Sequence, residues 1–196
     1  RPATTAALTG GLGATRSHDR SRPDGRGERL DDRGRVGLLG LHRLDLAELL
    51  VELRSGEQVH GDNIKIVTGK ETGKILYQTD GLITREKGII LAVFTADCLP
   101  VFIFDKIKKI IGLVHAGRLG LSKRIVSKAI DMFVKNFGSC SLDIHTAIGP
   151  HICKQCYNID LDAIAEGQLK KAGVSNISNS KLCTYTGDFF SYRKTK

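Results

Sequence analysis

The sequence GIILAVFTADCLPVFIFDKIKKIIGLVHAG, residues 88–117, decides the fold of this chain. Two apolar, β-branched segments, 88–104 and 110–114, flank the polar residues 105–109. This pattern predicts a β-hairpin, and a turn at Lys106 and Ile107 fixes its register. In that register Cys98 and His115 lie opposite each other on one face, with Cβ atoms about 4.5–5.5 Å apart.

A thiol and an imidazole at this separation suit two kinds of chemistry. They are ligands for a metal ion, or they form a nucleophilic pair in which the imidazole activates the thiol. A buried Cys98 that packs as a small apolar residue beside a hydrogen-bonded core His115 is the third interpretation. The prediction depends on the turn, because a one-residue change in register moves a side chain to the other face.

The sequence after residue 54 alternates strand and helix patterns. Strands are predicted at 64–67, 81–84 and 142–148, helices at 121–137 and 161–172, and a last apolar segment at 189–192. Gly138 and Gly173 follow the two helices, as helix-ending glycines do. We therefore expect a single layered α/β domain over residues 55–196, with a central mixed sheet and the β-hairpin carrying the site.

Residues 1–54 differ in composition from the rest. They contain ten Arg and no Lys, whereas the remainder contains sixteen Lys and four Arg. Residues 16–35 hold too few apolar side chains to offset the entropy of ordering. We expect segment 1–54 to be largely disordered or non-native, for example through a frame error or fusion, with a helix at 38–53 from its periodicity. An Arg-rich arm that binds nucleic acid is the alternative, although eight acidic residues nearly offset the ten Arg.

Composition also bounds the partners. The net charge is +9, but the lysines are scattered without an aromatic platform among them, so we expect no nucleic-acid partner. No apolar run approaches the roughly 18 residues that span a bilayer, so we expect no membrane partner. The five cysteines are odd in number and no secretory leader opens the chain, which predicts a reduced, cytoplasmic protein. Nothing in the sequence indicates an oligomeric state.

Two ligands do not hold a metal ion, so a third group must converge on Cys98 and His115. His60 is the best candidate among the other histidines, because the glycine after it permits a tight turn or a close backbone approach before a strand. His145 alternates with apolar neighbours on a predicted strand, and we assign it to the surface. His151 follows a Gly-Pro turn and is a weaker candidate for lining the site.

Ordered segments between about residues 57 and 193 resemble the successive motifs of the YfiH-like purine nucleoside phosphorylase family, also labelled polyphenol oxidase or laccase-domain proteins. These segments are Gln58-Val59-His60-Gly61, Asp80-Gly81-Leu82-Ile83-Thr84, Thr95-Ala96-Asp97-Cys98-Leu99-Pro100, His115-Ala116-Gly117, Ile148-Gly149-Pro150 with Cys156-Tyr157, and Phe189-Phe190-Ser191-Tyr192-Arg193. The order and the approximate spacing of all these motifs make the resemblance specific, where any one motif alone would be weak.

The resemblance implies a Zn²⁺ site formed by His60, Cys98 and His115. Two imidazoles, one thiolate and an open fourth position are a catalytic rather than a structural zinc arrangement. The implied reaction is phosphorolysis of adenosine, inosine, guanosine or S-methyl-5'-thioadenosine, with adenosine deamination as a companion activity. Zinc would activate water for deamination and, with nearby donors, would position phosphate for phosphorolysis.

The chain departs from the family pattern in three places. Arg118-Leu119-Gly120 follows His115-Ala116-Gly117, where the family has Trp-Arg-Gly, and Arg118 is the candidate for binding an anionic substrate group. Residues 4–13 match the family's N-terminal segment poorly. The chain stops soon after the last motif, where relatives continue, so we expect a catalytic domain truncated at its C-terminus.

Three further features have a functional and a plain structural interpretation. Backbone amides at the Gly149-Pro150 turn would face a phosphate, or the proline only fixes a tight turn. Asp97 orients a neighbouring ligand or faces solvent, and we favour the first. Cys153 and Cys156 form the Cys-x-x-Cys pattern of zinc knuckles and redox pairs, but no second pair accompanies them, and we interpret the pattern as coincidence.

Other functions fit the sequence less well. Multicopper oxidation needs many imidazoles and the chain has six His, although Cu²⁺ displaces Zn²⁺ from such ligands in vitro. A metal-free hydrolase or deamidase, with Cys98 as nucleophile and His115 as base, is the first alternative. A non-catalytic nucleoside-binding relative is the second, because the Trp-Arg pair is missing.

Overall fold

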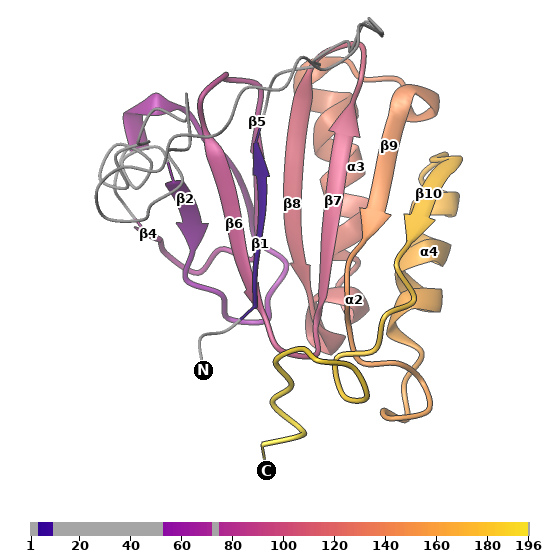
Figure 1. Cartoon of the computed structure of the whole chain (residues 1–196). Coiled ribbons are helices and arrows are strands. Elements are labelled where there is room, and N and C mark those ends of the chain that lie inside the picture. Colours follow the sequence, from indigo (N-terminus) through magenta and orange to yellow (C-terminus); the bar gives the residue numbers. More distant parts are fainter. Residues whose placement is uncertain (1–3, 10–52, 72–74, 196) are drawn as a thin grey trace, which may run out of the picture.

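The structure is a computed structural model of the chain, and it describes residues 4–9, 53–71 and 75–195 (Figure 1). The strands are β1 (Thr4–Thr9), β2 (Leu53–Gly56), β3 (Ile64–Ile66), β4 (Ile75–Leu76), β5 (Gly81–Thr84), β6 (Ile90–Thr95), β7 (Leu99–Asp105), β8 (Ile110–Ala116), β9 (Ile144–Ile148) and β10 (Asn176–Asn179). The helices are α2 (Arg118–Ser122), α3 (Ile125–Phe137) and α4 (Leu161–Lys171), with 3₁₀ turns at Gly69–Glu71 and Ser141–Asp143.

The strands form two mixed sheets. The larger is six-stranded in the order β10-β9-β7-β8-β5-β3, and the smaller is four-stranded in the order β1-β6-β2-β4. Antiparallel pairs join β5, β8, β7 and β9, whereas β3 and β10 pair in parallel at the two edges. The helices lie against one face of the six-stranded sheet (Figure 1). The predicted layered α/β domain is confirmed, with two mixed sheets in place of one.

The hairpin of β7 and β8 is present, but its predicted register is wrong. The strands pair from Leu99 opposite Ala116 to Asp105 opposite Ile110, so the turn comprises residues 106–109. Asp105 stabilises this longer turn, because its Oδ1 accepts hydrogen bonds from the amides of Ile107 and Lys108, each at 2.8 Å. The error shifts the pairing by two residues, which returns every side chain to the face that the prediction gave it.

The apolar segment 88–104 is not one continuous arm of that hairpin. Its first part, β6, belongs to the four-stranded sheet, and its second part, β7, belongs to the six-stranded sheet. Asp97 lies between them with a φ of 94°, in the left-handed region, where the chain turns from one sheet to the other. Cys98 is therefore the last residue before β7, at the point where the two sheets separate.

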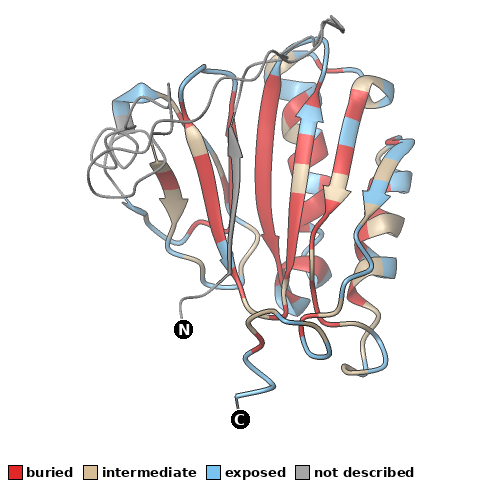
Figure 2. Ribbon diagram, viewed as in Figure 1, coloured by how far each residue is buried: buried red, intermediate tan, exposed pale blue. Residues whose placement is uncertain are grey.

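The main core lies between α3 and the six-stranded sheet, where β8 is buried along its whole length (Figure 2). Ile125, Ala129, Ile130 and Phe133 lie on the predicted face of α3 and are buried, whereas Val134 is 42% exposed. The ring of Phe133 lies against Gly112 of β8, where a Cβ would be 2.9 Å from Phe133 Cε2. The amphipathic pattern thus predicted the buried face of α3 correctly except at Val134.

The helix ends follow the predicted signals with one difference. Gly138 caps α3 in the left-handed conformation, with φ of 67°. The predicted helix at 121–137 is two helices, because Arg124 has a φ of 62° and separates α2 from α3. At α4 the Asp160 carboxylate accepts a hydrogen bond from the amide of Ala163, a standard N-cap.

Two parts of residues 1–54 lie in the four-stranded sheet. β1 pairs with β6 in antiparallel register from Thr4 opposite Thr95 to Thr9 opposite Ile90. Leu53, the last residue of the predicted helix at 38–53, begins β2, and Arg54 beside it is fully buried. These strand residues lie at the two ends of the segment that we expected to be largely disordered. Residues 10–52, which include the stretch 16–35 and most of the predicted helix, lie outside the described residues. None of the helices in the described ranges is long and apolar enough to cross a membrane.

Candidate metal centre

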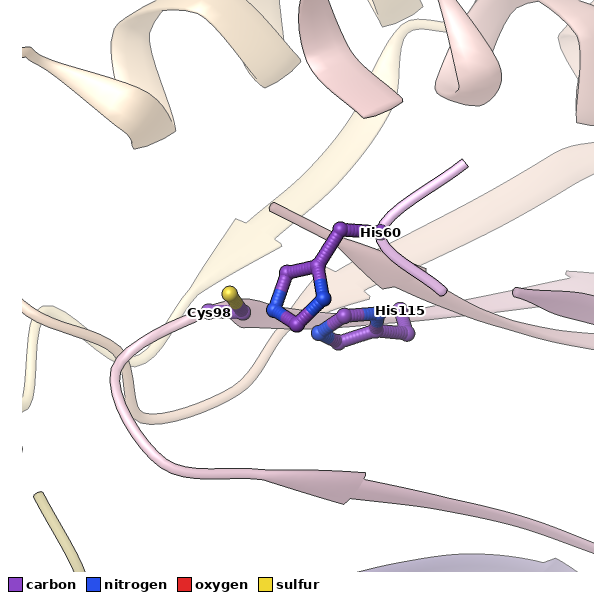
Figure 3. A group of neighbouring side chains, drawn as sticks. All are labelled: His60, Cys98 and His115. Carbon is purple, nitrogen blue, oxygen red and sulfur yellow. The ribbon is translucent and has the colours of Figure 1, made fainter. Parts of the chain in front are cut away.

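The structure brings His60, Cys98 and His115 together. His60 lies in the loop between β2 and β3, Cys98 immediately before β7, and His115 near the end of β8. Their ligand atoms all lie within 4.8 Å of one another, and Figure 3 shows the two rings side by side with the sulfur next to them. The imidazole centroids are 4.8 Å apart with an angle of 79° between the ring planes. One thiol and two imidazoles at this spacing are a donor set that fits a divalent ion such as Zn²⁺.

Asp80 holds two of these residues in place. This fully buried residue directly precedes β5, and its Oδ1 is 2.8 Å from Nδ1 of His115. An imidazole whose Nδ1–H donates to a carboxylate keeps Nε2 free for a metal, and the carboxylate fixes the orientation of the ring. The amide of His115 also donates to the carbonyl oxygen of Asp80 at 2.7 Å. Asp80 is therefore a positioning residue that the sequence reasoning missed, although it begins one of the quoted motifs.

The same carboxylate shapes the loop that carries His60. It accepts hydrogen bonds from the amides of Val59 at 3.2 Å, His60 at 2.9 Å and Gly61 at 2.8 Å. These consecutive amides form a concave donor site around the anion, and they support the φ of 59° at His60, which is unusual for a residue other than glycine. Burial opposes ionisation, but the hydrogen bonds from His115 and the loop amides lower the pKa of Asp80.

The absence of a side chain at Gly117 provides the space in which the three candidate ligands meet. A Cβ at this position would be 3.0 Å from Sγ of Cys98, 3.1 Å from Cδ2 of His60 and 3.9 Å from Cε1 of His115. The residue is the N-cap of α2, so the helix begins directly beside the cluster. Sequence reasoning quoted Gly117 within a motif but did not assign it to the site, because its contacts exist only in the folded chain.

Without a metal, Cys98 in this cluster is a neutral thiol and not a thiolate. Burial and the nearby carboxylates of Asp97 and Asp80 raise the pKa of Cys98 to about 11, so the thiol is protonated at neutral pH. Burial and the neighbouring His115 lower the pKa of His60, which keeps it a neutral ligand. A bound cation deprotonates a coordinating thiol outright, whereas a nucleophilic cysteine without metal needs a lowered pKa. These observations count against the metal-free Cys/His enzyme.

A cavity of about 680 Å³ opens onto the cluster. Its cationic side chains are Arg118 and Arg193, and the guanidinium carbon of Arg193 lies 4.3 Å from the ring centroid of Tyr157. The remaining lining residues are Gly56, Gln58, His60, Phe94, Ala96, Asp97, Cys98, His115, Leu119, Ile152, Leu161 and Tyr192. The volume suits a small molecule, and aromatic rings with arginines suit a flat base attached to an anionic or polar group.

Asp97 does not take the ligand-orienting role that its neighbour Cys98 suggested. Its side chain is buried, with Oδ1 accepting from the Thr184 hydroxyl at 2.8 Å and Oδ2 from the amide of Arg193 at 3.0 Å. Its carbonyl oxygen accepts from the amide of Ile152 at 3.0 Å. Asp97 therefore fastens the C-terminal segment to the rim of the cavity.

The Gly149-Pro150 turn does not offer amides to a phosphate. The amide of Gly149 donates to the carbonyl oxygen of Pro100 at 3.0 Å, and Pro150 has no N–H. A Cβ on Gly149 would be 2.8 Å from Cγ of Pro100, so close packing explains this glycine. Neither residue is among those that line the cavity at the cluster, so the plain structural interpretation of this turn accounts for both residues.

The other predicted histidines lie away from the cluster. His145 on β9 is exposed, as expected. His151 is buried outside the cavity lining, with Nδ1 at 2.9 Å from the carbonyl oxygen of Gly149 and Nε2 at 3.7 Å from Asp162.

Comparison with known proteins places the chain in a family. Residues 41–162 and 157–196 match the family model described as multi-copper polyphenol oxidoreductase laccase. The Bacillus subtilis protein named purine nucleoside phosphorylase YlmD is 36% identical over 118 residues, which is 55% of this chain and 42% of that protein. The Streptomyces griseus protein named purine nucleoside phosphorylase ORF3 is 31% identical, covering 71% of this chain and 68% of that protein.

Solved structures show the same fold. Hypothetical protein YfiH of Bacillus licheniformis superimposes with a TM-score of 0.72 at 28% identity, over 74% of this chain and 70% of that one. YlmD from Geobacillus stearothermophilus gives a TM-score of 0.72 at 29% identity, over 74% and 69%. The chain spans about half the length of the first curated relatives, 42% and 50%. The chain belongs to the YfiH-like family, whose model carries the laccase description.

Proposed function

We propose that this protein is a zinc-dependent purine nucleoside phosphorylase with His60, Cys98 and His115 as the metal ligands. The observation that carries the proposal is the convergence of these side chains, within 4.8 Å, at a cavity of about 680 Å³ lined by aromatic and arginine side chains. The names of the curated relatives support the same class of reaction. The substrates we assign are adenosine, inosine, guanosine and S-methyl-5'-thioadenosine, together with phosphate.

Each part of the cavity has a task in this proposal. When bound, Zn²⁺ supplies positive charge and an acidic coordination position at the cavity wall. Asp80 holds the His115 ring, and the amides around the same carboxylate hold His60. Arg118, exposed at the start of α2, and Arg193 both line the cavity and are the cationic side chains that we assign to phosphate binding. Fixed charges of this kind neutralise the anion without reorganising during the reaction.

The nucleoside base has an aromatic environment in the same cavity. Phe94, Tyr157 and Tyr192 are among its lining residues, and flat rings of this kind stack on purines. Adenosine deamination as a companion reaction uses the same base-binding wall and the same three ligands. We also infer a cytoplasmic location, because Cys98 must stay reduced to bind metal and the five cysteines are all free thiols.

Copper oxidation, which the family description names, has less support in this cavity. Among the described residues, the cluster at the cavity holds two imidazoles, whereas multicopper chemistry needs several copper centres with many imidazole ligands. Cu²⁺ binding in place of Zn²⁺ at His60, Cys98 and His115 would give rise to oxidase activity in vitro.

The test combines metal content and turnover on one sample. Protein purified without added metal should contain about one zinc at this site and should release adenine and ribose 1-phosphate from adenosine in the presence of phosphate. Cys98→Ala should lose the one zinc equivalent held at this cluster and the turnover together, whereas Cys140→Ala, which removes an exposed cysteine outside the cavity lining, should keep both. A fully active Cys98→Ala protein whose zinc content is unchanged would refute the site, and nucleoside binding without turnover in the unsubstituted chain would indicate a non-catalytic relative.

A further inference from the structure

A second cluster of three cysteines lies outside the cavity described above. Cys153 and Cys156 come from the loop between β9 and α4, and Cys183 comes from the segment after β10. Their sulfur atoms all lie within 4.8 Å of one another, and all are free thiols with intermediate exposure. We interpreted the Cys-x-x-Cys pattern as coincidence because the sequence does not show that Cys183, 27 residues after Cys156, lies beside the pair.

Backbone hydrogen bonds hold both of the segments that carry these cysteines. The amides of Cys156 and Tyr157 both donate to the carbonyl oxygen of Cys153 at 3.0 Å, forming one tight turn that holds the first two sulfurs on the same side. Cys183 is fixed by a parallel bridge to His151, in which the amide of His151 donates to Leu182 at 3.1 Å. The amide of Cys153 then donates to the sulfur of Cys183 at 3.4 Å. An amide directed at a sulfur is the hydrogen bond that stabilises a metal thiolate.

We propose that Cys153, Cys156 and Cys183 bind a second Zn²⁺ ion, with the fourth position taken by solvent. Three sulfur donors form a softer set than the two imidazoles and one thiol of the first cluster, and thiolate sets of this kind select thiophilic ions. Binding replaces up to three thiol protons, which are released to water, and involves no oxidation or reduction. A disulfide, by contrast, would join two of the sulfurs, would need an oxidant and would leave the third thiol unpaired.

The second ion would connect two segments of the cavity wall. Tyr157, which lines the cavity, directly follows Cys156, and Arg193 stacks on its ring at 4.3 Å. On the other segment, Thr184 directly follows Cys183 and donates to Asp97 at 2.8 Å, as does the amide of Arg193 at 3.0 Å. A zinc ion bound by both segments would therefore hold the loop that precedes α4 against the C-terminal segment, and so would stabilise the part of the cavity wall that carries Tyr157 and Arg193.

Metal stoichiometry tests this proposal on the whole chain. The protein is stripped of metal under reducing conditions, given Zn²⁺, desalted and analysed for zinc per chain. We expect about two equivalents in the unsubstituted chain and in the control Cys140→Ser, and about one in Cys183→Ser and in Cys98→Ser. The second site would be overturned if Cys183→Ser retained two equivalents. It would also be overturned if the chain bound zinc that is lost in Cys98→Ser and kept in full in Cys183→Ser. One equivalent that Cys183→Ser removes and Cys98→Ser keeps would support it even if the first site fails.

A second measurement needs no substitution and so is independent of whether a variant folds. Zn²⁺ should slow alkylation of Cys153, Cys156 and Cys183 by iodoacetamide at least tenfold, as followed by peptide mass spectrometry, and should leave Cys140 unaffected. A separate measurement compares the two variants with Co²⁺ in place of Zn²⁺. The sulfur-to-metal absorption band should be roughly three times as intense in Cys98→Ser as in Cys183→Ser, because three sulfurs ligate the ion in the first variant and only the Cys98 sulfur ligates it in the second. Equal alkylation rates with and without Zn²⁺ would contradict the proposal.

Discussion

Replacing Asp80 by Asn is the sharpest test of how this fold builds its first metal centre. The carboxylate accepts from four donors, which divide between its oxygens. His60 N at 2.9 Å and His115 Nδ1 at 2.8 Å point at Oδ1, while Val59 N at 3.2 Å and Gly61 N at 2.8 Å point at Oδ2. Asparagine keeps one oxygen and turns an NH₂ group toward the other pair of donors, so two hydrogen bonds are lost.

The size of the effect follows from that count. An unsatisfied buried donor costs about 1–3 kcal/mol, so the loss of two hydrogen bonds should lower the free energy of unfolding by about 2–6 kcal/mol. Loss of a partner that orients a metal-bound histidine typically lowers metal affinity by about 10–100-fold. This change in affinity corresponds to about 1.4–2.8 kcal/mol of binding free energy. Zinc affinity should therefore fall measurably even in conditions where the variant remains folded.

The assay is a chelator competition for zinc at neutral pH, with urea unfolding of the metal-free protein measured in parallel. Asp62→Asn is the matched control, because Asp62 lies in the same loop but forms ion pairs with Lys128 and Lys123 at the surface. It should keep the zinc affinity and lose at most about 1 kcal/mol of stability. Wild-type zinc affinity in Asp80→Asn would refute the role assigned to this carboxylate.

Three further predictions concern pH, the space between the ligands and the core. Folding lowers the pKa of Asp80, so the stability that the ionised carboxylate contributes is complete above the unfolded pKa of about 3.9 and is lost as the pH falls through the lower folded pKa. The free energy of unfolding should therefore drop more in acid for the wild type than for Asp80→Asn. Equal drops with pH in the urea unfolding of the two proteins would contradict this prediction. Gly117→Ala should weaken zinc binding at least about tenfold in chelator competition, because a Cβ would lie 3.0 Å from the Cys98 sulfur, whereas Gly167→Ala on α4, with open space around it, should keep zinc and gain up to about 1 kcal/mol. Phe133→Ala should lower the unfolding free energy by about 3–5 kcal/mol in urea, because the ring is fully buried against β8, and a loss below 1 kcal/mol would show that the core is misplaced.

The hairpin shows what a local pattern predicts well. Alternating apolar and polar segments located both arms, and the correct face of Cys98 and His115 survived an error of two residues in the register. The error arose at the turn, because the Asp105 side chain stabilises a longer loop than the one expected. Turn length depends on a few side-chain hydrogen bonds, whereas strand pattern is averaged over many residues.

The strands that the prediction missed are those without a pattern of their own. β10 has the sequence Asn-Ile-Ser-Asn and is a strand because it pairs in parallel with β9 at the sheet edge. β1 and β2 lie in a segment whose composition indicated disorder, yet both pair with β6. Strands of this kind take their conformation from the neighbours with which they pair, so periodicity does not reveal them.

The sequence by itself determined the layered α/β fold, the family, and the three residues proposed to hold a metal, because apolar periodicity and ordered motifs are properties of the chain. Only the tertiary structure decided that the carboxylate that orients a candidate ligand is Asp80, through His115, and not Asp97, which neighbours Cys98 in the sequence. It also decided that Cys183 joins the pair at Cys153 and Cys156. Both outcomes depend on contacts between residues far apart in the sequence, 35 positions for Asp80 and His115. Strand pairing and loop closure create those contacts, and neither is encoded in local spacing.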